Sequence, residues 1–267
     1  MLFKIWRKVF GVEQSLVAKS SNMHTSTKEI PKKVWIYWAQ GWENAPALIK
    51  LCRDSWIQNN PGWEIIQLTD ANLAQYVHLD YSLKGKEVPH AAYSDIIRMH
   101  LLSHYGGVWV DATTFCSAPL DTWLPSAKQS GFFAFQKPKT TLASWFLAAE
   151  QGNALVRKWD DYVTCYWKYA HKPGRYFWLH YLFEYLIVRD PIARKMWQET
   201  PQVSSIGPYA ARDCLKTAGS GTSQCLDLLF DPNVPVHKLD WKAQTPGGFF
   251  SNLRSRLDEV ERSGISL

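Results

Sequence analysis

Residues 90–114, HAAYSDIIRMHLLSHYGGVWVDATT, decide the fold of this chain. Ala91, Asp95, Arg98 and Leu102 follow one another at spacings of four, three and four, so they share one face of a predicted helix. Asp95 and Arg98 are therefore neighbours on that helix. An ordinary ion pair three residues apart is one interpretation, and a carboxylate and guanidinium held ready for a ligand is the other.

Gly106 and Gly107 end this predicted helix, because glycine adopts the left-handed conformation of a helix C-cap at little cost. Residues 108–110, VWV, lack polar alternation and are typical of a strand buried on both faces of a parallel sheet. Asp111 follows at the carboxyl end of that strand, which is the edge where open α/β sheets bind ligands. The stretch thus predicts an α/β fold with a site around Asp111.

These residue types suit one kind of chemistry. A carboxylate at a strand end can hold a divalent cation, which can in turn hold a diphosphate. Asp95 can accept hydrogen bonds from sugar or ribose hydroxyls, and Arg98 can pair with a phosphate. Asp111 alone is equally well explained as a turn former, so the hypothesis rests on the combination in one short segment.

Further elements surround this segment. We expect strands at residues 34–38, 63–69 and 132–135, and helices at 46–60, 71–77, 140–158, 162–169, 176–188 and 249–262. Residues 204–223 are rich in glycine and polar side chains and are expected to form a mobile loop over the site. Tyr176, His180 and Glu184 share a helical face, which allows a general acid or base there.

The segments SDIIR, residues 94–98, and YGGVWVDAT, residues 105–113, resemble a known core. It is the SDxxR…GGxYxDxD pattern of sugar-nucleotide glycosyltransferases with the GT-A fold, shared by family 32 sugar transferases, glucosylating clostridial toxins and capsular polysaccharide synthesis proteins. The capsular group is the most similar, and IPKKVWIYWAQG and SWIQNNPGWEI resemble its opening segments. The resemblance covers residues from about 30 to about 242. One departure is that DxD becomes Asp111-Ala112-Thr113, so the second carboxylate is missing.

The resemblance implies a donor site. It implies that Mn²⁺ or Mg²⁺ binds Asp111, with His237 as a second ligand and Thr113 as a weak or water-mediated one; an imidazole ligand would favour Mn²⁺. A late lysine, Lys238 or Lys242, would neutralise the departing diphosphate. The remaining residues that the resemblance places at the nucleotide sugar are Trp35, which stacks on the base, and Trp38, Gln40, Gly107, Ser144 and Asn153.

Strand alternation limits this expectation. Trp35 and Tyr37 lie on one face of the predicted strand and Trp38 lies on the other, so they cannot all line one pocket. The alternative for Trp35 is a purely structural place inside the sheet.

Length and composition fit one globular domain. The chain has 267 residues, of which 46% are hydrophobic and 20% charged, and its formal net charge is +6. A basic surface suits anionic partners such as nucleoside diphosphates, and no nucleic-acid motif is present, so nucleic acid is not expected as a partner. Five scattered cysteines without a CxxC pair predict reduced thiols in a cytosol, with neither a zinc site nor a disulfide framework.

The chain is expected to consist of residues 1–29, an amphipathic helix with a polar linker, and residues 30–267, a single GT-A domain. Residues 1–19 are too short and charged to cross a membrane, but a basic aromatic helix can lie in a membrane interface. A helix packed on its own domain is the other interpretation. We therefore expect a cytoplasmic protein, and under the first of these two interpretations residues 1–19 contact the inner face of the cell membrane.

Together these features predict a glycosyltransferase. It would move a hexose from a nucleoside-diphosphate sugar, a UDP-sugar being favoured, to a hydroxyl of a growing surface polysaccharide or lipid-linked oligosaccharide, with retention at the anomeric carbon implied by the resemblance. The alternative is a carbohydrate-binding protein or inactive homologue, suggested by the 14 tryptophans and the missing carboxylate. A glycoside hydrolase needs two opposed carboxylates, and Asp111 and Asp95 have no clear partner of that kind.

Overall fold

A five-stranded sheet forms the centre of the computed structural model, which describes residues 29–124, 130–137, 141–217, 223–240, 252, 253 and 255. The strands lie in the order β2-β1-β3-β6-β5. Their bounds are β1 Lys33–Tyr37, β2 Glu64–Leu68, β3 Gly107–Asp111, β5 Phe132–Ala134 and β6 Phe146–Ala149. β2, β1 and β3 are parallel, and β6 runs antiparallel to both β3 and β5. The predicted α/β fold with a mostly parallel central sheet is confirmed.

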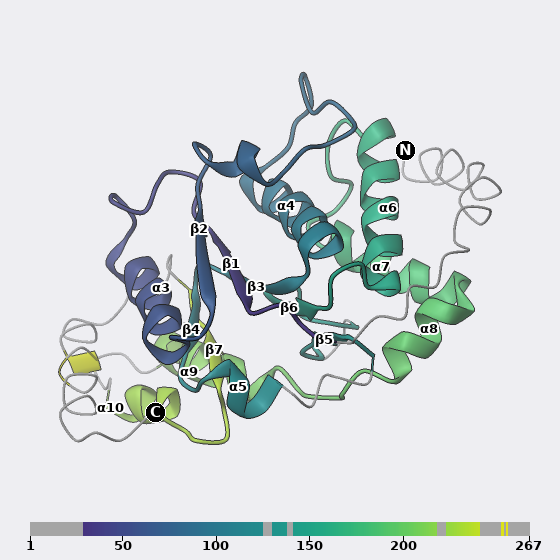
Figure 1. Cartoon of the computed structure of the whole chain (residues 1–267). Coiled ribbons are helices and arrows are strands. Elements are labelled where there is room, and N and C mark those ends of the chain that lie inside the picture. The colour runs from purple at the N-terminus through teal and green to yellow at the C-terminus, as the bar shows by residue number, and fades with distance from the viewer. Residues whose placement is uncertain are drawn as a thin grey trace.

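Helices cover both faces of this sheet (Figure 1). One face packs on α4, α6, α7 and α8, and Trp35 and Trp109 point to that side. The other face packs on α3 and α5, and Val34, Ile36 and Val110 point there. The helices are α3 Ala47–Asn59, α4 His90–Tyr105, α5 Leu120–Trp123, α6 Ala154–Tyr169, α7 Trp178–Arg189 and α8 Pro191–Gln198, with a short 3-10 helix at Leu73–Gln75. Every residue of the VWV run is buried, as predicted for a central strand.

The strand order creates a switch point between β1 and β3. The chain leaves β1 through α3 to reach β2 on one side, then returns through α4 to β3 on the other side. Right-handed crossovers place these two helices on opposite faces of the sheet. Open α/β sheets bind ligands beyond the carboxyl ends of their strands at such a point. Tyr37 lies directly beside Asp111 there in the register of β1 and β3.

A second, two-stranded sheet lies next to that edge. β4, Thr114–Cys116, pairs antiparallel with β7, Val236–Lys238, so that Thr114 is opposite Lys238. α9, Ile206–Thr217, and α10, Ser223–Leu229, complete this layer (Figure 1). The pairing brings Lys238 to the residues that follow Asp111, although 127 positions separate the two in the sequence.

Two sequence predictions were wrong here. Residues 140–158 do not form one helix, because residues 146–149 enter the sheet as β6 and the helix α6 begins only at Ala154. Burial between β3 and β5 outweighs the helix propensity of the alanines in this run. Residues 204–223 do not form a mobile loop over their whole length, since residues 206–217 are the helix α9.

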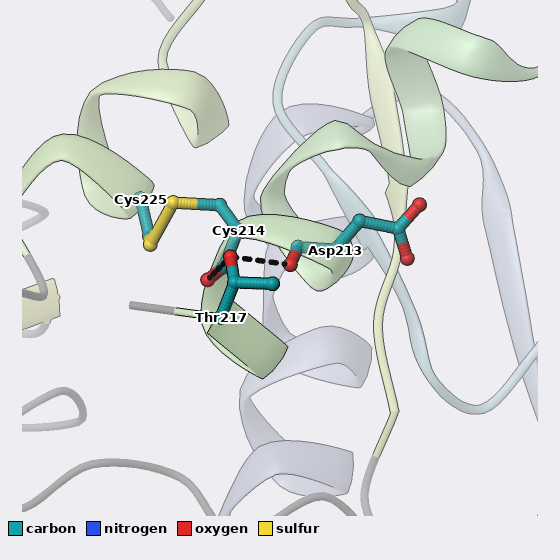
Figure 2. Close-up of a disulfide and its surroundings, with 4 residues drawn as sticks. All are labelled: Asp213, Cys214, Thr217 and Cys225. Atoms are coloured by element: carbon teal, nitrogen blue, oxygen red, sulfur yellow. Dashed lines mark hydrogen bonds between the residues drawn. A yellow bond between two sulfur atoms is a disulfide. The ribbon is translucent and has the colours of Figure 1, made fainter. Parts of the chain in front are cut away.

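The prediction that all cysteines are reduced was also wrong. Cys214 of α9 and Cys225 of α10 form a disulfide, with their Cα atoms 5.6 Å apart (Figure 2). The two cysteines are eleven residues apart in the sequence, and this spacing alone does not show that their helices face each other. Cys52, Cys116 and Cys165 are free and buried. The cysteine argument for a reducing compartment therefore no longer holds.

Several expectations fall outside the described residues. These are the amphipathic helix at residues 1–19 and its linker, Lys242, and most of the helix expected at 249–262. Among the helices that the structure does describe, none combines the length and apolar character needed to cross a membrane.

Gly107 allows β3 to approach β1 closely. Its φ is +91°, and a Cβ there would lie 2.7 Å from the Lys33 carbonyl oxygen and 3.2 Å from Trp35 Nε1. Gly85 also has a positive φ, +76°, but a Cβ there would meet open space. An alanine at Gly85 would therefore cost only the unfavourable backbone conformation, without a steric overlap.

We predict that Gly85→Ala lowers the free energy of unfolding by about 1–2 kcal/mol, the cost of a left-handed non-glycine residue. Gly107→Ala should lose about 1–3 kcal/mol more, because the new methyl group overlaps backbone atoms. Urea unfolding of both variants beside the wild type measures this. Equal losses in the two variants would contradict the close packing of β1 and β3.

Candidate active site

Arg98 is the centre of the candidate site. Its side chain projects from α4, is 5% exposed, and contacts three separate segments. Nη1 donates to the Ser144 carbonyl oxygen at 2.6 Å, while Nη2 lies 3.1 Å from Asp111 Oδ1 and 3.2 Å from Asp95 Oδ1. The guanidinium also lies 5.1 Å from the centre of the Trp109 ring. One cation thus fixes the carboxyl end of β3 relative to α4 and to the residues before β6.

Lys238 contacts the other carboxylate oxygen of Asp111. Its Nζ lies 3.1 Å from Asp111 Oδ2 and donates a hydrogen bond to Thr113 Oγ1. Trp109 Nε1 donates to Asp111 Oδ1 at 3.1 Å. Both carboxylate oxygens of Asp111 therefore already have positively charged partners, and the side chain stays 26% exposed at the sheet edge.

The two carboxyl groups differ in their electrostatics. Burial alone would raise the pKa of Asp111, but Lys238 and Arg98 outweigh it and hold the pKa below its usual value. For Asp95 burial dominates and raises the pKa to about 7, although Arg98 acts in the opposite direction. Asp111 is therefore a stable anion at neutral pH, whereas Asp95 is close to its midpoint.

His180 of α7 lies near the charges of Arg98 and Asp111. Burial lowers its pKa to about 4, and the nearby charge of Arg98 acts in the same direction. The imidazole is therefore neutral at physiological pH. The sequence indicated His180 only through its spacing from Tyr176 and Glu184, and Tyr176 itself is 77% exposed and precedes α7.

Two contacts around Arg98 were not anticipated. Ser94 Oγ accepts from Arg98 Nη2 at 3.3 Å, and Trp109 provides both the ring beneath the guanidinium and an N–H for Asp111. Sequence signals for both existed. Ser94 precedes Arg98 by one helical turn, and Trp109 precedes Asp111 by two residues, which puts both indole and carboxylate on one face of the strand.

Trp35 does not offer its ring to a nucleotide base. It is fully buried in β1, its Nε1 donates to the Gly106 carbonyl oxygen at 2.8 Å, and Tyr76 and Tyr105 pack against it. The structural alternative is the correct one, because the residue lies in mid-strand between two other strands.

Gly107 and Asn153 do not join the site either. Gly107 begins β3, about 13 Å along the strand from Asp111. Asn153 is 1% exposed and N-caps α6, accepting hydrogen bonds from the backbone of Leu155 and Val156. Its place in the sequence, just before a helix, is explained by capping.

Trp38 and Gln40 lie in the turn after β1, at the same edge of the sheet as Asp111. Trp38 is half-buried on the α3 side, and Gln40 is exposed. Their contact with a nucleotide stays a prediction.

His237 does not face Asp111. Alternation along β7 turns Lys238 toward Asp111 and His237 to the opposite side, where it is fully buried. Burial lowers the pKa of His237 to about 4, while Asp231 and the backbone of Val234 and Leu229 raise it only in part.

The expected metal ligands therefore do not form a set. Asp111 and Thr113 both contact Lys238, and His237 points away from them. The residues present do not fit the divalent ion that the family pattern implies. A different group with ligand-like atoms within 4.8 Å of one another is His100 and His104 of α4 with Asp160 of α6, and this group is separate from the contacts of Asp111 described above.

The fold and the edge around Asp111 define an α/β protein with a charged site at the switch point of its sheet. The chain belongs to the capsular polysaccharide synthesis protein family, which residues 5–248 match. The predicted family is thereby confirmed.

Relatives with assigned names are distant. The O-glycosyltransferase braB of Annulohypoxylon truncatum is 23% identical over 178 residues, which are 58% of this chain and 42% of that protein. The inositol phosphoceramide mannosyltransferase 1 of Schizosaccharomyces pombe is 26% identical over 156 residues, which are 55% of this chain and 47% of that protein. The chain thus spans less than half the length of these relatives. A solved structure, the PaToxG glycosyltransferase, aligns with a TM-score of 0.43 at 15% identity, covering 74% of this chain and 84% of that one.

The position of His237 has a consequence for stability. Because its pKa is about 4 in the folded protein and about 6.5 in the unfolded chain, the unfolded state binds the extra proton first as pH falls. The stability that neutral His237 provides is therefore lost as the pH drops from about 6.5 to 4.

We predict that the free energy of unfolding of the wild type, relative to His237→Gln, decreases by about 3 kcal/mol between pH 7 and pH 4. Urea titrations at the two pH values measure it, and the same substitution at the exposed His90 is the control. No pH dependence of the difference would mean that His237 is not buried away from charge.

Proposed function

We propose that this protein is a glycosyltransferase that moves a sugar, a hexose, from a nucleoside-diphosphate donor, most suitably a UDP-sugar, to an acceptor hydroxyl. The observation that carries the proposal is the Arg98–Asp111–Lys238 group beyond the carboxyl ends of β1 and β3. Ligands of open α/β sheets bind at such a switch point. Family membership and the names of the relatives agree with this chemistry.

In this proposal Arg98 and Lys238 bind and stabilise the diphosphate. Glycosyl transfer leaves negative charge on the diphosphate as its bond to the anomeric carbon breaks. Fixed cations aimed at developing charge are usually the largest contribution to catalysis in such sites. Asp111 keeps the two cations apart and in place, because each of its oxygens contacts one of them.

Asp95 is proposed to hold the donor sugar. It is 13% exposed beside Arg98, and its carboxyl group can accept hydrogen bonds from sugar hydroxyls. A pKa near 7 lets the same group exchange a proton at neutral pH. Neutral His180 lies close enough to sense the charges of Arg98 and Asp111 and is a further candidate for contact with the substrate.

The acceptor is proposed to approach over α7. A cavity of about 440 Å³ there is lined mainly by aromatic and aliphatic side chains, among them Tyr166, Trp178, Tyr181 and Tyr185, and also by the charged Arg175 and Glu184. Trp178, which lines this cavity, lies near enough to Asp95 to affect the pKa of that carboxyl group. Aromatic rings suit sugar faces and apolar carriers alike, as a growing surface polysaccharide or a lipid-linked oligosaccharide would present. The proposed membrane contact through residues 1–19 would bring the protein close to a lipid-linked oligosaccharide.

The proposal is tested first by ligand binding. A ligand that binds only the folded state raises its stability, so purified protein should melt at higher temperature with one of a panel of nucleotide sugars. We also expect the protein to hydrolyse that donor slowly when no acceptor is present. Stabilisation by glycans alone, with no response to any nucleotide, would instead favour a carbohydrate-binding protein.

We predict that Asp95→Asn keeps the binding of the nucleoside diphosphate but lowers donor turnover about 100-fold, a typical loss for one positioned polar group in an active site. Turnover is followed by release of the nucleotide. Asp54→Asn, which removes an exposed carboxylate paired with Arg53 on α3, is the control and should turn over normally. Unchanged turnover in Asp95→Asn would remove this residue from the site.

A further inference from the structure

The ammonium of Lys238 lies between the first and third residues of the Asp111-Ala112-Thr113 motif. It contacts Asp111 Oδ2 at 3.1 Å and donates to Thr113 Oγ1. These two side chains are the ones that the family pattern would offer to a divalent ion. In this chain they bind a cation that is part of the protein.

Lys238 is held at this position by the backbone. β7 pairs with β4 so that Lys238 is opposite Thr114, and the Leu239 N–H donates to the Thr113 carbonyl oxygen at 2.9 Å. Val236 and His237, just before it, are fully buried. The lysine side chain itself is only 19% exposed. It is therefore a fixed charge at the sheet edge and differs from an ordinary surface lysine, whose ammonium samples many positions.

The group has no excess negative charge that would attract a divalent ion. Asp111 and Asp95 carry at most two negative charges, and Arg98 and Lys238 carry two positive ones. A divalent ion at Asp111 and Thr113 would have to displace Lys238 from both contacts and would then lie close to two cations. Repulsion between like charges in a partly buried site opposes that exchange. A diphosphate, in contrast, presents oxygens that can accept hydrogen bonds from Arg98 and Lys238, so neither cation has to leave the site.

We propose that Lys238 replaces the divalent metal ion, so that this chain binds and releases the donor diphosphate without a metal. The inference rests on the proposed glycosyl transfer. In that step the bond between the anomeric carbon and the diphosphate oxygen breaks, and the electron pair stays on the diphosphate beside Lys238 and Arg98. The acceptor hydroxyl oxygen bonds to the anomeric carbon, and its proton passes to the departing phosphate.

Binding of nucleoside diphosphates in a chelator tests this directly. UDP, GDP, ADP, CDP and dTDP are titrated into the protein by calorimetry, once with excess EDTA and once with Mn²⁺. We expect one of them to bind with a Kd that differs less than about threefold between the two conditions. Donor hydrolysis should be equally insensitive to EDTA.

Substitutions of Lys238 then identify the cation responsible. Lys238→Ala should weaken binding in EDTA about 10- to 100-fold, the range expected for losing one hydrogen bond between charged groups. Lys238→Arg keeps the charge and should retain most of the affinity, which separates loss of charge from loss of folding. The matched control is Lys216→Ala, because Lys216 forms an exposed ion pair with Asp240 and the variant should bind like the wild type.

The possible failures are distinguishable. If the wild type and His104→Ala both bind a nucleoside diphosphate only with Mn²⁺, the ion acts at the donor site and not through the group formed by His100, His104 and Asp160, so the inference about Lys238 is wrong and the proposed function stands. If no nucleoside diphosphate or nucleotide sugar binds in either condition, the proposed function itself is wrong.

Discussion

The guanidinium of Arg98 joins parts of the molecule that are far apart in the sequence. It contacts Asp95 on its own helix, Asp111 at the end of β3, and the Ser144 carbonyl that precedes β6. A buried arginine needs such partners, since an unpaired charge away from water is costly. The same contacts hold α4 against the edge of the sheet and fix the distances between the charged groups of the site there. Arg98 therefore serves both the packing of the fold and the chemistry of the site.

The small β4–β7 sheet adds the second cation. Lys238 is more than a hundred residues from Asp111 in the sequence, and the β4–β7 pairing brings the two side chains together. The register of that pairing also decides that Lys238 faces the motif while His237 points away from it. α9 and α10 support this sheet, and the Cys214–Cys225 disulfide joins those two helices (Figure 2). A covalent link therefore lies in the layer that positions the lysine.

Local patterns were sufficient for the central segment. The spacing of Asp95 and Arg98, the paired glycines and the apolar VWV run predicted α4, β3 and the place of Asp111 correctly. Sequence could not decide features set by tertiary partners. The alanine-rich run at residues 146–149 is a strand because two strands flank it, and Trp35 is a core residue because its strand is central. The disulfide depends on how two helices pack.

A crystal structure of the protein with the nucleoside diphosphate that binds best, grown in EDTA, tests the central claim most directly. We expect the terminal phosphate beside Asp111, with Lys238 Nζ and the Arg98 guanidinium within hydrogen-bond distance of its oxygens. The nucleotide should occupy the same place in crystals soaked with Mn²⁺. A metal ion bridging Asp111 and the phosphate, with Lys238 turned away, would contradict the role of the lysine. A nucleotide bound elsewhere would contradict the site.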